Sequence, residues 1–237
     1  MRFNQRQLFA VILCNLLTGL DAVLKPYLDP PLNRFDWLIG RWRSVYCDGC
    51  KVRWPTIPKM NYDETLDFWP AEVSRQSKNM YYINYTAIAT SHNTGDHFHN
   101  EYGYLTVTPS GFVKMFAIGN NGFATVEKGI IDFGLMILDS ESVERIVVAR
   151  ELPTEQIKRE FRMNGDLMQV TLNMRTKTHP RKTDPNCEKY KSCPMQEHAF
   201  NQYEKVLSLA DLVDVHKKIA AGEIDPDNAP NFDFKRG

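Results

Sequence analysis

The stretch QIKREFRMNGDLMQVTLNM, residues 156–174, gives the clearest indication of the fold. Two runs of alternating apolar and polar residues flank Asn164 and Gly165. An Asn-Gly pair between two such runs is the strongest short-range signal for a β-hairpin. Alternation with a period of two places successive side chains on opposite faces of a strand, so each run predicts a strand with one buried face.

The same pattern extends on both sides of this hairpin, from Asp36 to Val206. Short alternating runs such as YGYLTVT and FVKMFAI end in the turn sequences PSG and GNNG. The pattern predicts roughly nine or ten consecutive strands without helices between them. Because closure removes exposed sheet edges, we expect an all-β fold, an antiparallel up-and-down β-barrel of the calycin or lipocalin type, with a sandwich as the alternative.

A different pattern follows the strands, in residues 207–237. Ser208 is a typical helix N-cap, Asp211 lies in the predicted first turn, and apolar residues then recur at helical spacing until GEIDPD. This predicts one C-terminal helix with a loose end. The predicted organisation is a barrel over residues 23–206, interrupted by a polar, Cys-containing loop at 175–194, and a helical tail.

Composition limits the classes of function. A chain of 237 residues that is 43% hydrophobic is long enough for one domain with a sizeable core. Its 29 Lys and Arg balance 29 Asp and Glu, so the formal charge is zero. Because nucleic-acid binding surfaces are strongly basic, this balance argues against a nucleic-acid partner.

The first 22 residues are typical of a secretory signal peptide. Arg2 and Arg6 precede an apolar run from Leu8 to Leu20, and Ala22 is a small residue suited to cleavage. The run is shorter than the about 20 apolar residues that a membrane span needs. We expect cleavage after Ala22, no stable membrane insertion thereafter, and a secreted or secretory-lumen location; an uncleaved anchor helix is the alternative.

Export changes the interpretation of the cysteines. Cys47, Cys50, Cys187 and Cys193 remain after cleavage, and an even number in an oxidising compartment favours disulfides. We favour the two local bridges, Cys47 with Cys50 and Cys187 with Cys193, although four cysteines allow three connectivities. A zinc site or a thiol-redox role for CDGC is less supported, because neither a histidine at finger spacing nor a βαβ unit accompanies it.

One glycosylation sequon, NYT, begins at Asn84. If Ile83, Tyr85 and Ala87 of the strand YYINYTAIA face inward, alternation directs Asn84 outward, where a glycan would be tolerated. An unused sequon is the alternative.

A barrel of this size encloses space for one small ligand. In the stretch MQEHAFNQYEKV, residues 195–206, strict alternation would place His198 and Phe200 on the same face. If that face is the interior, the imidazole lies in an apolar pocket, and a single proximal histidine commonly holds haem iron. The alternative is a half-exposed strand histidine whose ring is satisfied locally.

Several stretches in a fixed order now point to a known family. They are FDWLIGRWRS, WPTIPKMNYDE, HNEYGYLTVTP, GNNGFATVEKG, VVAREL, EQIKREFRMNGDL and MQEHAFNQYEKV. Through them the chain resembles the nitrobindins over nearly all of residues 35–206. The resemblance implies a ten-stranded barrel that binds haem b through one axial histidine. It also implies a ferric iron that binds nitric oxide and isomerises peroxynitrite to nitrate.

The resemblance assigns three residues to the haem. His198 corresponds to the axial iron ligand and Thr56, in WPT, to a haem contact. Arg150, in ARE, stands where many members have a lysine, and arginine keeps a cation for a propionate. The family pattern Gly-x-Trp-x-Gly-x-Gly is only partly kept, because GRWRSVY has Ser44 and Tyr46 in place of two glycines.

The other histidines give weaker indications. His97 and His99 alternate in DHFHNEYGY, a pair that could hold a metal, but a structural strand histidine is the favoured interpretation of His99. His92 and His179 lie in polar loops and are expected to be solvated, and His216 to be solvated or partly packed.

Three other functions stay open at this point. They are a secreted carrier of an apolar ligand such as a fatty acid or retinoid, a haem carrier without turnover, and an interaction module. The sequence leaves enzymatic turnover undecided, and it leaves the oligomeric state open, a homodimer included.

Overall fold

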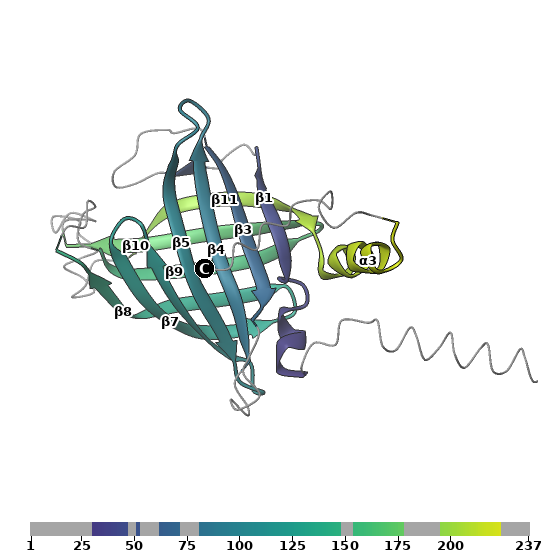
Figure 1. Ribbon diagram of the computed structural model, residues 1–237. Helices are drawn as coiled ribbons and strands as arrows, with labels where there is room; N and C mark the ends of the chain where they lie inside the picture. The colour runs from purple at the N-terminus through teal and green to yellow at the C-terminus, as the bar shows by residue number, and fades with distance from the viewer. Residues whose placement is uncertain are drawn as a thin grey trace, which may run out of the picture. The chain divides into compact units, whose positions relative to one another are not determined.

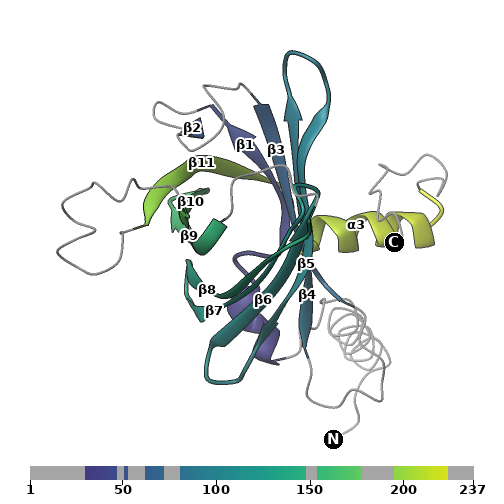
Figure 2. The ribbon, with the colours of Figure 1, turned by 90° about the vertical axis from the view of Figure 1, so that its left-hand side faces the viewer.

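Ten antiparallel strands form a closed barrel in the computed structural model (Figures 1 and 2), as the sequence predicts. The structure describes residues 30–46, 51–52, 62–71, 81–147, 154–177 and 195–223. The strands of the ring are β1 (Gly40–Val45), β3 (Tyr62–Pro70), β4 (Tyr82–Ser91), β5 (His97–Val107), β6 (Phe112–Gly119), β7 (Phe123–Asp132), β8 (Leu135–Arg145), β9 (Thr154–Asn164), β10 (Leu167–Thr176) and β11 (Gln196–Leu207).

Each strand of the ring pairs with its neighbours in this order, and the pairing of β1 with β11 closes it. The short strand β2 (Lys51–Val52) pairs with β11 in addition. The Asn-Gly hairpin forms as predicted: Leu167 pairs with Asn164, and Gly165 has a φ of 61°, which favours glycine. Local turn chemistry and alternation therefore suffice to specify this hairpin.

The antiparallel order divides the barrel into two ends. Strands β3, β5, β7, β9 and β11 begin at one end, which we call the mouth, and finish at the other, which we call the closed end. The 3-10 helix η1 (Pro30–Phe35) lies at the closed end, where the Arg34 guanidinium donates to the Pro109 carbonyl in the β5–β6 turn. Phe35, Leu38 and Ile39, in and just after this helix, are fully buried.

Gly40 and Trp42, the two kept residues of the family pattern, secure the start of β1 at the closed end. Gly40 has a φ of 138°, and a Cβ there would lie 2.4 Å from a carbonyl oxygen of β11, so the position requires glycine. The buried Trp42 indole donates to the Leu38 carbonyl at 2.8 Å. The Lys205 ammonium lies 4.7 Å from the centroid of the Trp42 ring, a cation–π contact.

The C-terminal helix α3 (Leu209–Ala220) begins where the sequence predicts. The Ser208 hydroxyl accepts from the Asp211 backbone amide, and the Asp211 carboxylate accepts from the Ser208 amide at 2.7 Å, which completes a capping box. The helix belongs to a different compact unit of the chain from the barrel, whose unit is residues 28–207. No helix among the described residues has the length and apolarity to span a membrane.

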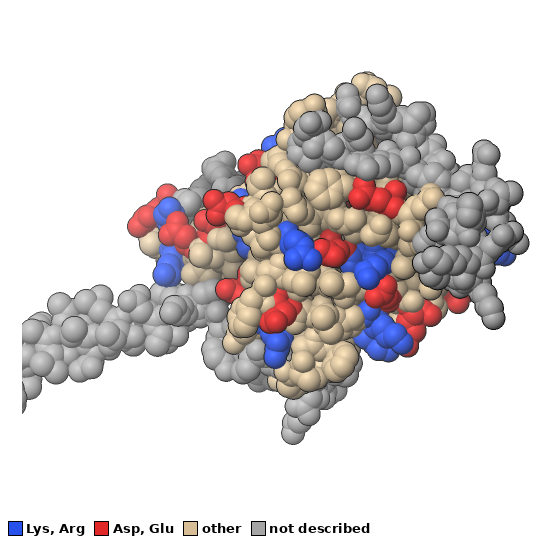
Figure 3. Space-filling view, turned by 180° about the vertical axis from the view of Figure 1, so that it is seen from behind, with Lys and Arg blue, Asp and Glu red and all other residues tan. Residues whose placement is uncertain are grey.

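Charges of both signs are interspersed on the face shown in Figure 3, without a large area of one sign. This agrees with the balanced composition. On β4, Asn84 is exposed while Ile83, Tyr85 and Ala87 are buried, as alternation predicts.

Several predictions lie outside the described residues. They are the signal peptide at 1–22, the four cysteines Cys47, Cys50, Cys187 and Cys193, and residues 178–194 of the predicted inserted loop. These stay predictions.

Candidate site at the mouth of the barrel

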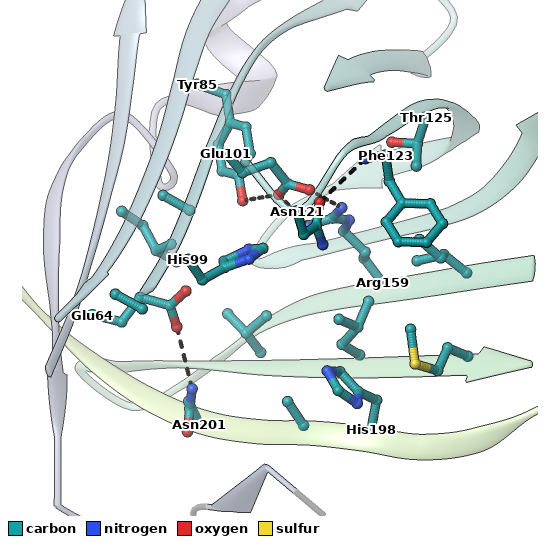
Figure 4. Close-up of a pocket in the computed structure, with 18 of the residues that line it drawn as sticks. Glu64, Tyr85, His99, Glu101, Asn121, Phe123, Thr125, Arg159, His198 and Asn201 are labelled. Carbon is teal, nitrogen blue, oxygen red and sulfur yellow. Dashed lines mark hydrogen bonds and ion pairs between the residues drawn. The ribbon is translucent and has the colours of Figure 1, made fainter. Parts of the chain in front are cut away.

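A cavity of about 210 Å³ lies within the mouth half of the barrel. Strands β3, β4, β5, β7, β9, β10 and β11 contribute its lining, so it is surrounded by most of the ring (Figure 4). One part of the lining is apolar, with Val170, Leu172 and Met174 on β10 and Ile157 on β9. The remainder carries histidines, tyrosines and buried charges. The cavity thus combines an apolar wall with a polar one.

His198 reaches this cavity because β11 contains a β-bulge. Leu172 of β10 pairs with Ala199, and the next residue, Asn173, pairs with Glu197, so His198 is the extra residue. His198 and Ala199 both line the cavity as a result, and Figure 4 shows the imidazole directed into it. A bulge re-aims side chains in this way and is over-represented beside functional sites.

The bulge also overturns part of the sequence prediction. Strict alternation places His198 and Phe200 on one face, and this is wrong because the extra residue shifts the alternation by one. Beyond the bulge, Asn201 and Tyr203 line the cavity and are buried, whereas Phe200 is absent from the lining. His198 does line the cavity, but Phe200 does not.

The environment of His198 keeps its ring neutral. Burial, followed by the positive charges of His99 and Arg159, lowers the pKa of His198 from 6.5 to about 4. The neutral imidazole is the form that binds metals. At neutral pH the His198 ring is therefore uncharged, the form that can bind a metal.

His99 reaches the cavity through a second bulge, in β5. Ala89 pairs with His99 and Thr90 with His97, so Phe98 is the extra residue. Phe98 and His99 both line the cavity, whereas His97 lies 3.2 Å from the Thr90 hydroxyl and is exposed. His97 and His99 therefore do not act as a pair on one face. Among the described residues no cluster of three or more His, Cys, Asp or Glu could hold a metal ion.

His99 is more than the structural strand histidine that the sequence favours. Its ring makes no hydrogen bond to the described part of the chain, yet it lines the cavity and points into it (Figure 4). Asn121, in the turn between β6 and β7, also lines the cavity; its side-chain oxygen accepts from the Phe123 amide at 3.3 Å. This leaves the Asn121 amide nitrogen and the His99 ring as polar groups available to an occupant.

The most buried polar feature of the site is a set of charges that we call the Arg159 cluster. The Arg159 guanidinium donates to both oxygens of Glu101, at 2.6 and 2.7 Å, and through Nε to both oxygens of Glu127, at 3.0 Å. The Tyr85 hydroxyl donates to Glu101 at 2.9 Å and the Thr125 hydroxyl to Glu127 at 2.8 Å. All five side chains are buried, so the charges depend on one another for solvation.

The two carboxylates of the Arg159 cluster differ in their acidity. Burial alone would raise the pKa of Glu101, but the charge and hydrogen bonds of Arg159 outweigh it and lower that pKa to about 2. Burial raises the pKa of Glu127, and Arg159 offsets this only in part. Glu101 is therefore the firmly ionised partner of Arg159, and Glu127 is the member that takes a proton more readily.

A second polar group, which we call the Glu64 cluster, consists of Tyr62, Glu64, Asn201 and Tyr203. It connects β3 with β11, the two strands that pair with β1. The Tyr203 hydroxyl donates to Glu64 at 2.5 Å, and the Asn201 amide donates to the Tyr62 hydroxyl at 2.6 Å. Burial, followed by the negative charge of Glu64, raises the pKa of both Tyr62 and Tyr203. Both phenols therefore stay protonated at neutral pH.

Neither cluster is predicted by the sequence pattern. Arg159 does share a face with Ile157 and Phe161 in the alternating run QIKREFRM, so a charge at an inward position was visible in the sequence. Its acidic partners come from distant strands, and only the closure of the barrel brings them together.

The remaining predicted positions have different outcomes. Thr56 and Arg150 lie outside the described residues, in stretches that precede β3 and β9, two strands that begin at the mouth. Ser44, which replaces a family glycine, accepts a hydrogen bond from the Glu64 amide at 2.8 Å and so joins β1 to β3 beside the mouth. Tyr46, at the other replaced glycine, is almost fully exposed.

The residues present fit a haem group. A neutral imidazole and an apolar wall are the groups that a haem iron and a porphyrin ring require. The cavity volume of about 210 Å³ is below the roughly 300–1,000 Å³ of pockets that enclose whole drug-sized ligands, so a macrocycle here would protrude from the mouth.

Comparisons with known proteins identify the family of this chain. A family model described as "THAP4-like, heme-binding beta-barrel domain" matches residues 31–205. Peroxynitrite isomerase THAP4 of Bos taurus is 30% identical over 171 residues, 69% of this chain and 28% of that protein. THAP4 of Mus musculus is 29% identical over 158 residues, 65% of this chain and 26% of that protein.

Two further matches come from a nematode and a bacterium. An uncharacterized protein of Caenorhabditis elegans, C28H8.5, is 36% identical over 111 residues, 43% of this chain and 36% of that protein. The chain thus corresponds to only about a quarter to a third of the length of these curated relatives. The crystal structure of Rv2717c from M. tuberculosis has the same fold, with a TM-score of 0.53 and 22% identity, and covers 76% of this chain and 99% of that one.

Proposed function

This chain belongs to the THAP4-like, haem-binding β-barrel family, and from this premise we propose that it binds haem b at the mouth, with His198 as the axial iron ligand. The observation that carries the proposal is the bulge in β11, which turns a neutral imidazole into the cavity beside an apolar wall. Thr56 and Arg150 remain the predicted contacts at the rim, the latter for a propionate.

The proposed activity is isomerisation of peroxynitrite to nitrate, together with reversible binding of nitric oxide. Support for it comes from the name of the THAP4 relatives, peroxynitrite isomerase. When bound, ferric haem supplies a Lewis-acidic iron that polarises an oxygen ligand. The protein contributes binding, orientation and exclusion of water.

Individual side chains divide this work. His198 fixes the position of the ring, and Leu172 and Met174 of β10 give it an apolar surface and keep water away. His99 and the Asn121 amide point into the same cavity and can hydrogen-bond to a small polar occupant. Placed in a site shielded from water, such groups act more strongly than in bulk solvent.

The charges in the cavity lining argue against the apolar-ligand carrier. Glu101 and Arg159 are buried there, and Glu64 is half-buried. The hydrocarbon part of a fatty acid or retinoid in that space would have to cover these charges without hydrogen-bonding to them, which costs free energy. A porphyrin ring that contacts only the apolar wall formed by β10 avoids that cost.

Haem binding is tested by titrating haemin into the purified chain and recording the absorption spectrum. A saturable Soret band is expected, and His198→Ala should lose it while its circular dichroism spectrum stays that of a β-barrel. His92→Ala, at an exposed histidine whose Nε2 lies 2.9 Å from an Asp63 carboxylate oxygen, is the matched control and should keep the band. Retention of the wild-type band by His198→Ala would overturn the assignment of the ligand.

Turnover is tested separately from binding. The haem-loaded chain, mixed with peroxynitrite in a stopped-flow instrument, should raise both the decay rate and the nitrate yield over those of buffer. A chain that binds haem but changes neither quantity would be a non-catalytic haem carrier.

A further inference from the structure

The outer surface of β4, β5 and β6 carries exposed apolar side chains, which we call the aromatic face. Tyr104 is 53% exposed, Ile118 59% and Phe116 43%. Tyr104 pairs with Phe116 across β5 and β6, and Tyr102, also exposed, pairs with Ile118 beside them. These four side chains are therefore contiguous. Monomeric proteins rarely leave such a patch uncovered unless it is functional.

The glycosylation sequon lies at the edge of the aromatic face. Asn84 is exposed on β4 and stands directly opposite Tyr104 on β5. Side chains in directly opposed positions have Cβ atoms about 4.5–5.5 Å apart. Tyr82, two residues before Asn84 and hence on the same side of β4, forms an edge-to-face contact with Tyr104, with ring centroids 6.3 Å apart. Two aromatic rings thus flank the Asn84 side chain.

Thr86, the third residue of the sequon, lies on the same side of β4. It is half-buried and stands opposite Tyr102. None of the outward residues at these positions is charged: they are Tyr82, Asn84 and Thr86 on β4 and Tyr102 and Tyr104 on β5. The sequon and the aromatic side chains therefore form one surface.

We propose that Asn84 carries an N-linked glycan, and that the first sugars of this glycan pack on Tyr82 and Tyr104 and cover the aromatic face. In the transfer, Asn84 Nδ2 forms a bond to the anomeric carbon of a lipid pyrophosphate-linked oligosaccharide. The bond from that carbon to the pyrophosphate oxygen breaks, the lipid pyrophosphate leaves with the electron pair, and the amide gives up one proton. The proposal rests on entry of the chain into the secretory lumen, which its signal-like N-terminus predicts, and is independent of haem binding.

The packing follows from the chemistry of the two surfaces. One face of a pyranose ring presents only C–H groups, which pack on an aromatic ring, while its hydroxyl groups stay in water. A tyrosine ring offers a large apolar surface of the same width. A glycan is also bulky and solubilising, so at this position it removes apolar surface from water and prevents close approach of a flat partner. Without the glycan, the exposed face favours self-association through β4–β6.

The modification is tested by expressing the full chain, with its own N-terminus, in insect cells and measuring its intact mass before and after treatment with peptide N-glycosidase F. A single glycan is expected, lost on treatment and absent from both Asn84→Gln and Thr86→Val. Asn93→Gln, which alters an exposed asparagine outside any sequon, is the matched control and should keep the glycan. Chain recovered from these cells with the mass of unmodified Asn84 would overturn the proposal.

Whether the glycan covers the aromatic face is tested on the glycosylated chain and the Asn84→Gln variant from the same cells. Asn84→Gln should bind more of an apolar-surface dye than the glycosylated chain does, and should elute from a sizing column as a larger species at equal concentration. Tyr104→Ser in the Asn84→Gln background should reduce both effects. Equal dye binding and equal size of the glycosylated and Asn84→Gln chains would show that the glycan does not cover the face.

Discussion

The closed end and the mouth of this barrel have the same strands but different interiors. At the closed end the strands direct apolar side chains inward, and Leu105, Val107, Val113 and Met136 are all buried, although β11 has a register shift at Val206. At the mouth, bulges in β5 and β11 interrupt the alternation, and the interior holds imidazoles, phenols and charges. The packed end stabilises the fold, and the irregular end contains the chemistry, as expected when functional sites depart from local rules.

The two ends of the barrel also differ in how their residues contribute to the stability of the fold. Each apolar residue of the closed end contributes largely by itself, through burial and packing. The members of the Arg159 cluster contribute only as a set, because each buried charge is solvated by the others. Substitutions should therefore behave additively at the closed end and cooperatively at the mouth.

Removing the central cation should have the largest effect. Arg159→Met leaves Glu101 and Glu127 buried without a positively charged partner and should lower the free energy of unfolding by about 3–5 kcal/mol. Denaturant unfolding of the chain measures this. Replacing Glu101 and Glu127 with leucine in the same variant should restore most of the loss. A triple variant no more stable than Arg159→Met would contradict the cooperative account of the mouth.

A cavity at the closed end should cost somewhat less. Met136 is fully buried there, and Met136→Ala should lower the free energy of unfolding by roughly 2–5 kcal/mol. Because Met136 is absent from the cavity lining, the haemin affinity of the folded fraction should not change. Both quantities are measured by denaturant titration and by haemin titration below the unfolding transition. A several-fold loss of haemin affinity would show that the two ends are not separate.

Acid should weaken the mouth selectively. Glu101 has a lowered pKa in the folded chain, so its contribution is complete above its ordinary pKa of 4.5 and is lost as pH falls toward 2. The loss from this residue should be about 3 kcal/mol by pH 2. Denaturant unfolding at several pH values measures it, and the difference between wild type and Glu101→Gln isolates this carboxylate. A difference that stays constant from pH 5 to pH 3 would contradict the assignment.

Restoring a family glycine should have the smallest effect. Ser44→Gly removes the hydroxyl that accepts from the Glu64 amide, and should lower the free energy of unfolding by about 1 kcal/mol. Thermal unfolding of the two chains measures the change. Stabilisation by this substitution would mean that the serine hydrogen bond does not help to hold β1 against β3.

Features that depend on local sequence could be predicted, and features that depend on the partner strand could not. The hairpin at Asn164 and Gly165, the closed antiparallel barrel and the helix that begins after Ser208 follow from turn chemistry, alternation and capping, which are local. The bulges could not be predicted, because an extra residue in one strand shows only against its partner strand. For this reason His198 was expected beside Phe200, although Ala199 and Asn201 are its true neighbours on the cavity wall.

The Arg159 cluster was unpredictable for another reason. Its three charges come from β5, β7 and β9, and Glu101 and Arg159 are separated by 58 positions in the chain. An inward charge is visible in each alternating run, but the identity of its partner depends on the register of several strands at once. Alternation and turn chemistry predicted the barrel, the resemblance to a family assigned His198 to the haem iron, and the polar interior became visible only in three dimensions.

The central claim is that the bulge in β11 presents His198 as the ligand of a haem iron. Resonance Raman spectroscopy of the ferrous, haem-loaded chain tests it most directly, through the iron–imidazole stretching band. The account predicts that the wild-type chain shows this band, that His198→Gly lacks it, and that added imidazole restores it. An unchanged band in His198→Gly without added imidazole would contradict the account.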